Sequence, residues 1–300
     1  MSLPRFAVYI IAHDAPHLFA DLVRSLHHPQ IDVYAHIDAK TDQVPFERAV
    51  AGSRTTSFVP GKERVSVNWG GASVVHATFA ALRIAQRSGV PYHRHTLLSG
   101  RDLLLRDLSD LIDSWCGDRE HLRVDRSLHD DNTSQAYRIT HYQFPDQPYL
   151  RRLSGRIARR RQIPRPVWHG STWWSLTDEA MTLVLDTVAA DPGWLHDFRY
   201  VLAPDEIVIQ SIIMNSPLAQ SVSQNYLGRP DSNHSLYAQH YIDWSDVNGI
   251  SPPDLRVDDL PRALGTGAMF ARKVSDDWTW RGGAIPSPQP DAPLGHRGQQ

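Results

Sequence analysis

FAVYIIA, residues 6–12, is a continuous apolar run that decides the fold class of this 300-residue chain. It is rich in β-branched and aromatic residues, which predicts a strand buried on both faces, as in the middle of a parallel sheet. Asp14 and Pro16 then predict a helix start, and Leu18–Leu26 has helical spacing. IDVYAHI, residues 31–37, repeats the strand pattern. The chain therefore opens with a strand–helix–strand unit.

The same alternation continues to about residue 115. We expect further strands at 58–59 and 92–98, and helices near Pro45, over 72–85 and within 103–115. Strands that alternate with helices in this way are typical of a parallel sheet. The sequence therefore predicts an α/β fold with a mainly parallel central sheet and helices on both faces.

The rest of the chain is less regular. Residues 118–165 are polar and end in a run of arginines, which we interpret as a long excursion over the surface. Thr177 can cap a helix that extends to about residue 190, and Pro204 is typical of another helix start. Residues 281–300 are rich in Pro, Gly, Asp and Gln and are expected to form a loosely ordered tail.

Composition excludes several classes of protein. The net charge of −2 provides no basic field for nucleic acid, and the single Cys116 excludes a framework of intrachain disulfides. No apolar run is long enough to span a membrane, and no signal peptide is evident at the start. A cytoplasmic protein is the expectation.

Polar residues follow three of the predicted strands. His13 and Asp14 come after the first, Asp38 and Lys40 after the second, and Asp102 after the strand at 92–98. Ligands of open parallel sheets bind at the carboxyl ends of the strands. These five residues are therefore candidates for a ligand site.

Common catalytic and nucleotide motifs are absent. The chain has no G-x-G-x-x-G, no Walker A loop, no C-x-x-C, no H-E-x-x-H and no G-x-S-x-G. His93 and His95 could be metal ligands, but ordinary surface or core histidines are the expectation.

Six short motifs occur in a fixed order and carry a resemblance. The series is similar to the core-2/I-branching β-1,6-N-acetylglucosaminyltransferases and the protein xylosyltransferases of glycosyltransferase family 14, over residues 6–274. The chain resembles the short bacterial members. The motifs are Tyr34-Ala-His-Ile-Asp-Ala-Lys40, Trp69-Gly-Gly-Ala-Ser73, Leu97-Leu-Ser-Gly-Arg-Asp102, Gly170-Ser-Thr-Trp-Trp174, Pro204-Asp-Glu206 and Met269-Phe-Ala-Arg-Lys273.

The resemblance implies a GT-A-like fold, a UDP-sugar donor, inversion at the anomeric carbon and no need for a metal or other cofactor. The residues agree on the last point, since Ser99-Gly-Arg-Asp102 has one carboxylate where a metal-dependent enzyme has D-x-D. Without a metal, lysine or arginine must neutralise the leaving UDP. Residues 1–280 would form one catalytic domain, with a nucleotide-binding half at 1–115 and an acceptor-side half at 166–280.

Site roles follow by matching this sequence to the family motifs. Glu206 would be the base that takes the acceptor's proton, and Lys273 would bind the diphosphate as a point charge with three donors. Donor-binding roles are implied for His13, Asp38, Trp69, Asp102, Arg272 and Lys273, and acceptor-binding roles for Trp173, Trp244 and Asp205. For Trp69, a buried core tryptophan is equally plausible.

The sequence departs from the family pattern at two positions. His240 stands where many relatives have an arginine, which leaves Arg229, Arg256 and Arg262 as alternatives for a second phosphate-facing cation. Thr172 stands where xylosyltransferases have an aspartate, which favours N-acetylglucosamine over xylose as the donor sugar.

The arginines between 151 and 165 have two interpretations. They form either a solvated basic loop or a lid that contacts an anionic acceptor, with peripheral membrane contact possible. The expected reaction moves a sugar from a UDP-sugar to a hydroxyl of a glycan or of a glycosylated small molecule. The alternatives are a UDP-xylose-dependent transferase and a catalytically silent protein that binds nucleotide or glycan. No nucleic-acid partner is expected.

Overall fold

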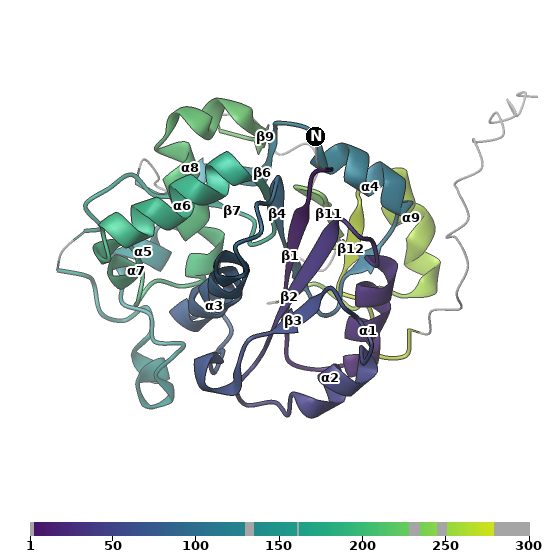
Figure 1. Cartoon of the computed structure of the whole chain (residues 1–300). Helices are drawn as coiled ribbons and strands as arrows, with labels where there is room; N and C mark the ends of the chain where they lie inside the picture. Colours follow the sequence, from purple (N-terminus) through teal and green to yellow (C-terminus); the bar gives the residue numbers. More distant parts are fainter. Residues whose placement is uncertain (1–2, 130–134, 161, 228–234, 245–250, 279–300) are drawn as a thin grey trace, which may run out of the picture.

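The central sheet has the strand order β3-β2-β1-β4-β8-β6-β7, with β9 beside β6 (Figure 1). The computed structural model describes residues 3–129, 135–160, 162–227, 235–244 and 251–278. The strands are β1 (Phe6–Ala12), β2 (Ile31–Ile37), β3 (Thr56–Phe58), β4 (Arg94–Ser99), β6 (Glu120–Ser127), β7 (Trp168–Gly170), β8 (Ser175–Thr177) and β9 (Val222–Asn225).

Most strands of this sheet run in one direction. β1 pairs in parallel with β2 and β4, and β2 pairs in parallel with β3. β8 and β7 run the opposite way, because β8 is antiparallel to β4 and β7 is antiparallel to β6. The predicted α/β class with a mainly parallel central sheet is confirmed.

Alternate residues of β1 explain why its sequence is apolar throughout. Ala7 and Tyr9 belong to the core on one face of the sheet, and Phe6, Val8 and Ile10 to the core on the other. All five are buried. A strand that is covered on both faces needs apolar residues at every position rather than at every second one.

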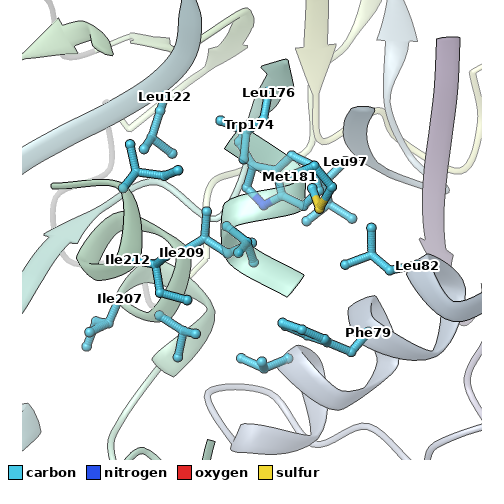
Figure 2. Packing of buried hydrophobic residues seen from close by; sticks show 14 of the residues in the cluster. Phe79, Leu82, Leu97, Leu122, Trp174, Leu176, Met181, Ile207, Ile209 and Ile212 are labelled. Atoms are coloured by element: carbon cyan, nitrogen blue, oxygen red, sulfur yellow. The ribbon is translucent and has the colours of Figure 1, made fainter. Parts of the chain in front are cut away.

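Helices cover both faces, as predicted. α3, α6 and α8 lie over one face, where Figure 2 shows Phe79 and Leu82 packing toward Met181, Ile209 and Ile212. α1, α2 and α4 cover the other (Figure 1). Their bounds are α1 (Pro16–Ser25), α2 (Val44–Ala49), α3 (Ala72–Ser88), α4 (Leu108–Trp115), α6 (Asp178–Ala190) and α8 (Val208–Met214); α5 (Tyr137–Thr140), α7 (Gly193–Asp197) and α9 (Leu260–Gly265) complete the described α-helices.

A second sheet returns the C-terminal part of the chain to the N-terminal part. Its order is β10 (Leu236–Tyr237), β11 (His240–Ile242), β12 (Phe270–Arg272) and β5 (Leu103–Leu104). β12 pairs with β5, and the Val274 amide donates to the Arg101 carbonyl over 3.0 Å. Residues 269–274 therefore lie against the loop that follows β4.

Residues 118–165 differ from the prediction of a surface excursion, because β6 lies inside the main sheet. The charged residues of β6 suggested a surface segment, but they are paired with other groups inside the protein. The buried Arg123 donates to Asp125 over 2.7 Å and lies 4.1 Å over the Tyr237 ring. Glu120 accepts from the backbone and the hydroxyl of Thr177. Paired charges can be buried in this way, but their sequence looks polar.

Two further expectations need comment. The helix expected from Pro204 begins as a 3-10 turn, Pro204–Glu206, and becomes α-helical only at Val208. Thr177 caps α6 as predicted, because its hydroxyl accepts from the Ala180 amide. The predicted tail at 281–300 lies outside the described residues. In the described part of the chain, no helix is long and apolar enough to cross a membrane.

Candidate active site

The residues that follow β1 and β2 differ in exposure. The His13 side chain is 68% exposed. Asp38 is buried, and its Oδ1 accepts from the backbone amides of Lys40 at 2.9 Å and Val67 at 3.4 Å. Asp38 thereby holds the turn that leads to Trp69, which is itself 65% exposed and so is not a core residue.

Asp102 is enclosed by protein donors. Its oxygens accept from Ser99, from His240 Nε2 at 3.1 Å and from Arg272 Nε at 3.3 Å. Burial alone would raise the pKa of Asp102, but the His240 hydrogen bond and the charges of His240 and Arg272 hold it below its usual value. The side chain has no exposed surface. This geometry does not support the predicted contact with donor hydroxyls; it supports a role in positioning Arg272 and His240.

Arg272 connects Asp102 with the aromatic residues of the Gly170–Trp174 motif. Its guanidinium carbon lies 4.1 Å from the centre of the Trp173 ring, a cation–π arrangement. The Trp173 ring in turn packs against His240, with ring centres 5.6 Å apart. Among the described residues, none accepts a hydrogen bond from the two Nη atoms of Arg272. These atoms are therefore available to an anionic ligand.

Lys273 lies in a cluster of charges beside the end of β1. Its Nζ is 3.0 Å from Asp254 Oδ1. Arg101 pairs with Asp14 at 2.9 Å and with Asp276 at 2.7 Å. Burial opposes ionisation of Asp14, yet the Arg101 hydrogen bond and the charges of His13, Arg101 and Lys273 lower its pKa. Lys273 is therefore close to the His13–Asp14 turn, although some 260 residues separate them in sequence.

Glu206 is held by two basic residues. Its Oε2 accepts from Arg138 Nη1 at 2.5 Å and lies 3.1 Å from His169 Nε2. Burial would raise the pKa of Glu206, but the His169 hydrogen bond and the charges of His169 and Arg138 outweigh it and lower the pKa. Within the described residues, no donor contacts Oε1. Glu206 is thus an ionised carboxylate with one oxygen available.

Asp205 beside it has the opposite electrostatic character. Burial, and then the charge of Glu206, raise its pKa to about 6, although Thr172 Oγ1 donates to its Oδ2 over 2.7 Å. Its Oδ1 is buried and has no partner among the described residues. Two adjacent carboxyls of this kind divide the roles, since one keeps its proton more readily and the other ionises.

We predict that Asp205 makes the folded state less stable as pH rises from about 4 to 6. A raised pKa means that the folded chain binds a proton in this window that the unfolded chain has lost, so the free energy of unfolding falls with pH. Asp205→Asn cannot titrate and should not show this fall. Urea unfolding of both proteins at pH 4, 5, 6 and 7 measures the difference, and parallel pH profiles would contradict the assignment.

The Trp69-Gly-Gly-Ala-Ser73 motif meets the Pro204–Glu206 turn. The Ala203 amide donates to the Gly70 carbonyl over 2.8 Å, immediately before the turn that carries Glu206. A Cβ at Gly71 would lie 2.3 Å from Asp146 Oδ1, and Asp146 also accepts from the amide and hydroxyl of Ser73. The glycines of this motif therefore allow a close approach that positions Glu206.

Gly170 allows an even closer approach. A Cβ at this position would lie 1.8 Å from the Arg123 carbonyl oxygen, which is backbone and cannot move aside. We expect Gly170→Ala to lower the free energy of unfolding by about 1–3 kcal/mol or more. Gly265→Ala is the matched control, because nothing lies within 4 Å of its Cβ. Urea unfolding compares them, and equal stabilities would refute the steric account.

A known protein family matches most of this chain. The family model described as Branch, Core-2/I-Branching enzyme, matches residues 6–267. The chain belongs to the Core-2/I-Branching enzyme family. The matched span begins at β1 and ends just after α9, so it includes Glu206 but stops before Lys273.

Relatives of known name are distant. Xylosyltransferase 2 of Rattus norvegicus is 24% identical over 289 residues, 90% of this chain and 32% of the relative. Xylosyltransferase oxt of Drosophila pseudoobscura pseudoobscura is 23% identical over 84% of this chain and 29% of the relative. The chain therefore spans about a third of the length of these relatives.

Solved structures are similar only in outline. The galactosyltransferase LgtC has a TM-score of 0.38 at 11% identity, over 90% of this chain and 87% of that one. Mouse xyloside xylosyltransferase 1 has a TM-score of 0.38 at 14% identity, over 96% of this chain and 100% of that one. Likenesses this weak carry no functional conclusion.

The remaining candidates fall into two groups. Trp244 is half-buried two residues after the end of β11. Of the alternatives for a second phosphate-facing cation, Arg229 lies outside the described residues. The backbone amide of Arg256 donates to Asp259 while the residue is exposed, and the Arg262 guanidinium pairs with Asp243 and Asp259. The Arg262 side chain thus has protein partners, and Arg272 is the arginine that lies beside Asp102 in this Core-2/I-Branching site.

Arg138 and His169 escaped sequence reasoning although both contact the predicted base. Arg138 belongs to the part of the chain that we had interpreted as a surface excursion. His169 directly precedes the Gly170–Trp174 motif, and this position could have marked it as a candidate site residue. Among the described residues, no group of three His, Cys, Asp or Glu side chains could hold a metal ion.

Proposed function

We propose that this protein is an inverting glycosyltransferase that moves a sugar from a UDP-sugar to a hydroxyl group, with Glu206 as the base. The main support is the Glu206 carboxylate, which Arg138 and His169 hold ionised with one oxygen available. Family membership supports the reaction class. Arg272, the last residue of β12, and Lys273, which follows it, supply positive charge.

In the proposed step, the acceptor oxygen attacks the anomeric carbon as Glu206 Oε1 takes its proton. The bond between the anomeric carbon and the diphosphate oxygen breaks, and its electron pair leaves with UDP. Arg272 and Lys273 neutralise the negative charge that develops on the diphosphate. One displacement with one base inverts the anomeric carbon.

For the donor sugar we propose N-acetylglucosamine, with xylose as the alternative. Thr172 supports the former, since it replaces the aspartate expected of xylosyltransferases and donates to Asp205. Xylose remains the alternative, because the distant relatives are named xylosyltransferases. The test is UDP release from a panel of UDP-sugars with glycoside acceptors. UDP binding without release from any donor would instead favour a catalytically silent binding protein.

Removal of divalent metal should leave activity unchanged. We assign neutralisation of the leaving UDP to Arg272 and Lys273, and no D-x-D motif is present. UDP release should therefore continue at the same rate in excess EDTA. Loss of activity in EDTA that manganese restores would refute this part of the proposal.

A further inference from the structure

Residues 147–160 form a projecting turn at one side of the molecule. Figure 1 shows the 3-10 helix of this turn (Pro148–Leu153), in teal at the lower left, away from the central sheet. Its base is fixed by backbone hydrogen bonds from Tyr142 to Ile157 at 2.8 Å and from Gly155 to Tyr142 at 3.0 Å. The turn is thus a structured protrusion on an ordered base.

Large apolar side chains are exposed on this protrusion. Tyr149 is 93% exposed, Leu150 40% and Ile157 42%. Isolated exposed apolar residues are ordinary, but three within nine positions on one projecting turn are a typical sign of an interaction surface. Among the described residues, Tyr149 is almost fully exposed, and Leu150 and Ile157 each present about two fifths of their surface to solvent.

Arginines surround these apolar residues without compensating acids. Arg151, Arg152, Arg156 and Arg160 are exposed, and residues 147–160 contain no Asp or Glu. No ion pair involves any of the four within the described residues. The neighbouring arginines are used differently.

Arg159 and Arg165 hold the protrusion to the body of the protein. Arg159 donates to the Asp197 carbonyl over 3.0 Å, and Arg165 pairs with the carboxylates of Asp197 at 2.8 Å and Asp191 at 3.2 Å. The arginines therefore divide into residues that fix the turn to the body and exposed residues that have no ion-pair partner in the described part of the chain, although Arg151 also donates to the Pro145 carbonyl at 3.3 Å.

We propose that residues 149–160 bind the surface of an anionic lipid bilayer. Arginines can contact the lipid phosphates, and Tyr149, Leu150 and Ile157 can enter the boundary between headgroups and acyl chains. A nucleic acid or an acidic glycan matches the charges but leaves Leu150 and Ile157 in water. The combination of both side-chain classes on one protrusion favours a membrane.

The protrusion is joined to the candidate active site. Asp146, at its base, accepts hydrogen bonds from Ser73 and from Asn68 Nδ2 at 3.3 Å, on either side of the exposed Trp69. Asp146 therefore connects the base of the protrusion to the loop that carries Trp69. The membrane proposal itself does not depend on the proposed reaction.

Vesicle flotation tests the proposal independently of catalysis. The wild-type protein should bind phosphatidylcholine vesicles that contain phosphatidylglycerol, bind pure phosphatidylcholine much less, and dissociate as salt rises. Arg151→Gln with Arg152→Gln should lower the partition constant about fivefold for each arginine. Tyr149→Ser with Ile157→Ser should weaken binding to anionic vesicles as well, because it removes the apolar contact.

The matched control is Val44→Ser with Arg48→Gln on α2, which exposes the same two residue types on another part of the surface. Its binding should equal that of the wild type, and far-UV circular dichroism should show that every variant is folded. Absence of binding to anionic vesicles at low salt would overturn the proposal. The proposal would also be overturned if the arginine variant lost binding while the Tyr149–Ile157 variant bound as well as the wild type. That result would indicate a surface for polyanions.

Discussion

Glu206→Gln should lower turnover by roughly 10²-fold or more while UDP binds as it does to the wild type. The amide can still accept hydrogen bonds from Arg138 and His169, so the turn is kept. It cannot take a proton from the acceptor hydroxyl. The measurements are the steady-state rate of UDP release at saturating donor and calorimetric titration with UDP.

A matched control distinguishes the loss of the catalytic base from the general effect of removing one negative charge. Glu47→Gln makes the same change on α2, where the side chain is exposed and contacts neither Glu206 nor its partners Arg138 and His169. It should leave turnover unchanged. If Glu206→Gln instead transfers sugar at near the wild-type rate, Glu206 is not the base.

Lys273→Ala should weaken the binding of UDP more than that of uridine, because uridine has no phosphates for the lysine to contact. Asp38→Ala should weaken both ligands by similar factors, because both contain the nucleoside. A charge-assisted contact contributes about 1.5–3 kcal/mol, or roughly 10- to 150-fold in affinity. Calorimetric titration of each variant with the two ligands gives the ratios.

The control for this pair is Lys62→Ala, which removes an exposed lysine from the 3-10 turn Gly61–Glu63. Its affinities for UDP and uridine should match those of the wild type. Equal losses for both ligands in the Lys273 variant would refute its phosphate role. Arg272, whose two Nη atoms donate to no described residue, would then be the remaining cation for the diphosphate.

The sequence predicted the regular half of the fold well, because its signals are local. β1 and β2 begin and end at the predicted residues, since a strand covered on both faces is apolar along its whole length. β6 was missed for the converse reason. Arg123 is buried beside Asp125 and two tyrosine rings, and those tyrosines come from a segment some hundred residues later.

The candidate site shows the same division. Motifs pointed to Glu206 and Lys273, and the structure places Lys273 beside the turn after β1. The partners of Glu206 could not be read from local spacing, because Arg138 and His169 lie 68 and 37 positions away. Asp102 was predicted to contact the donor, but a motif does not reveal that Ser99, His240 and Arg272 already occupy its oxygens.

The anomeric configuration of the transfer product tests the central claim most directly. An α-linked UDP-sugar should give a β-linked product, because a single displacement assisted by Glu206 exchanges the face of the anomeric carbon. The measurement is the anomeric proton coupling in the NMR spectrum of the product isolated from the first acceptor that supports UDP release. An α-linked product would contradict the one-base displacement and would require a different role for Glu206.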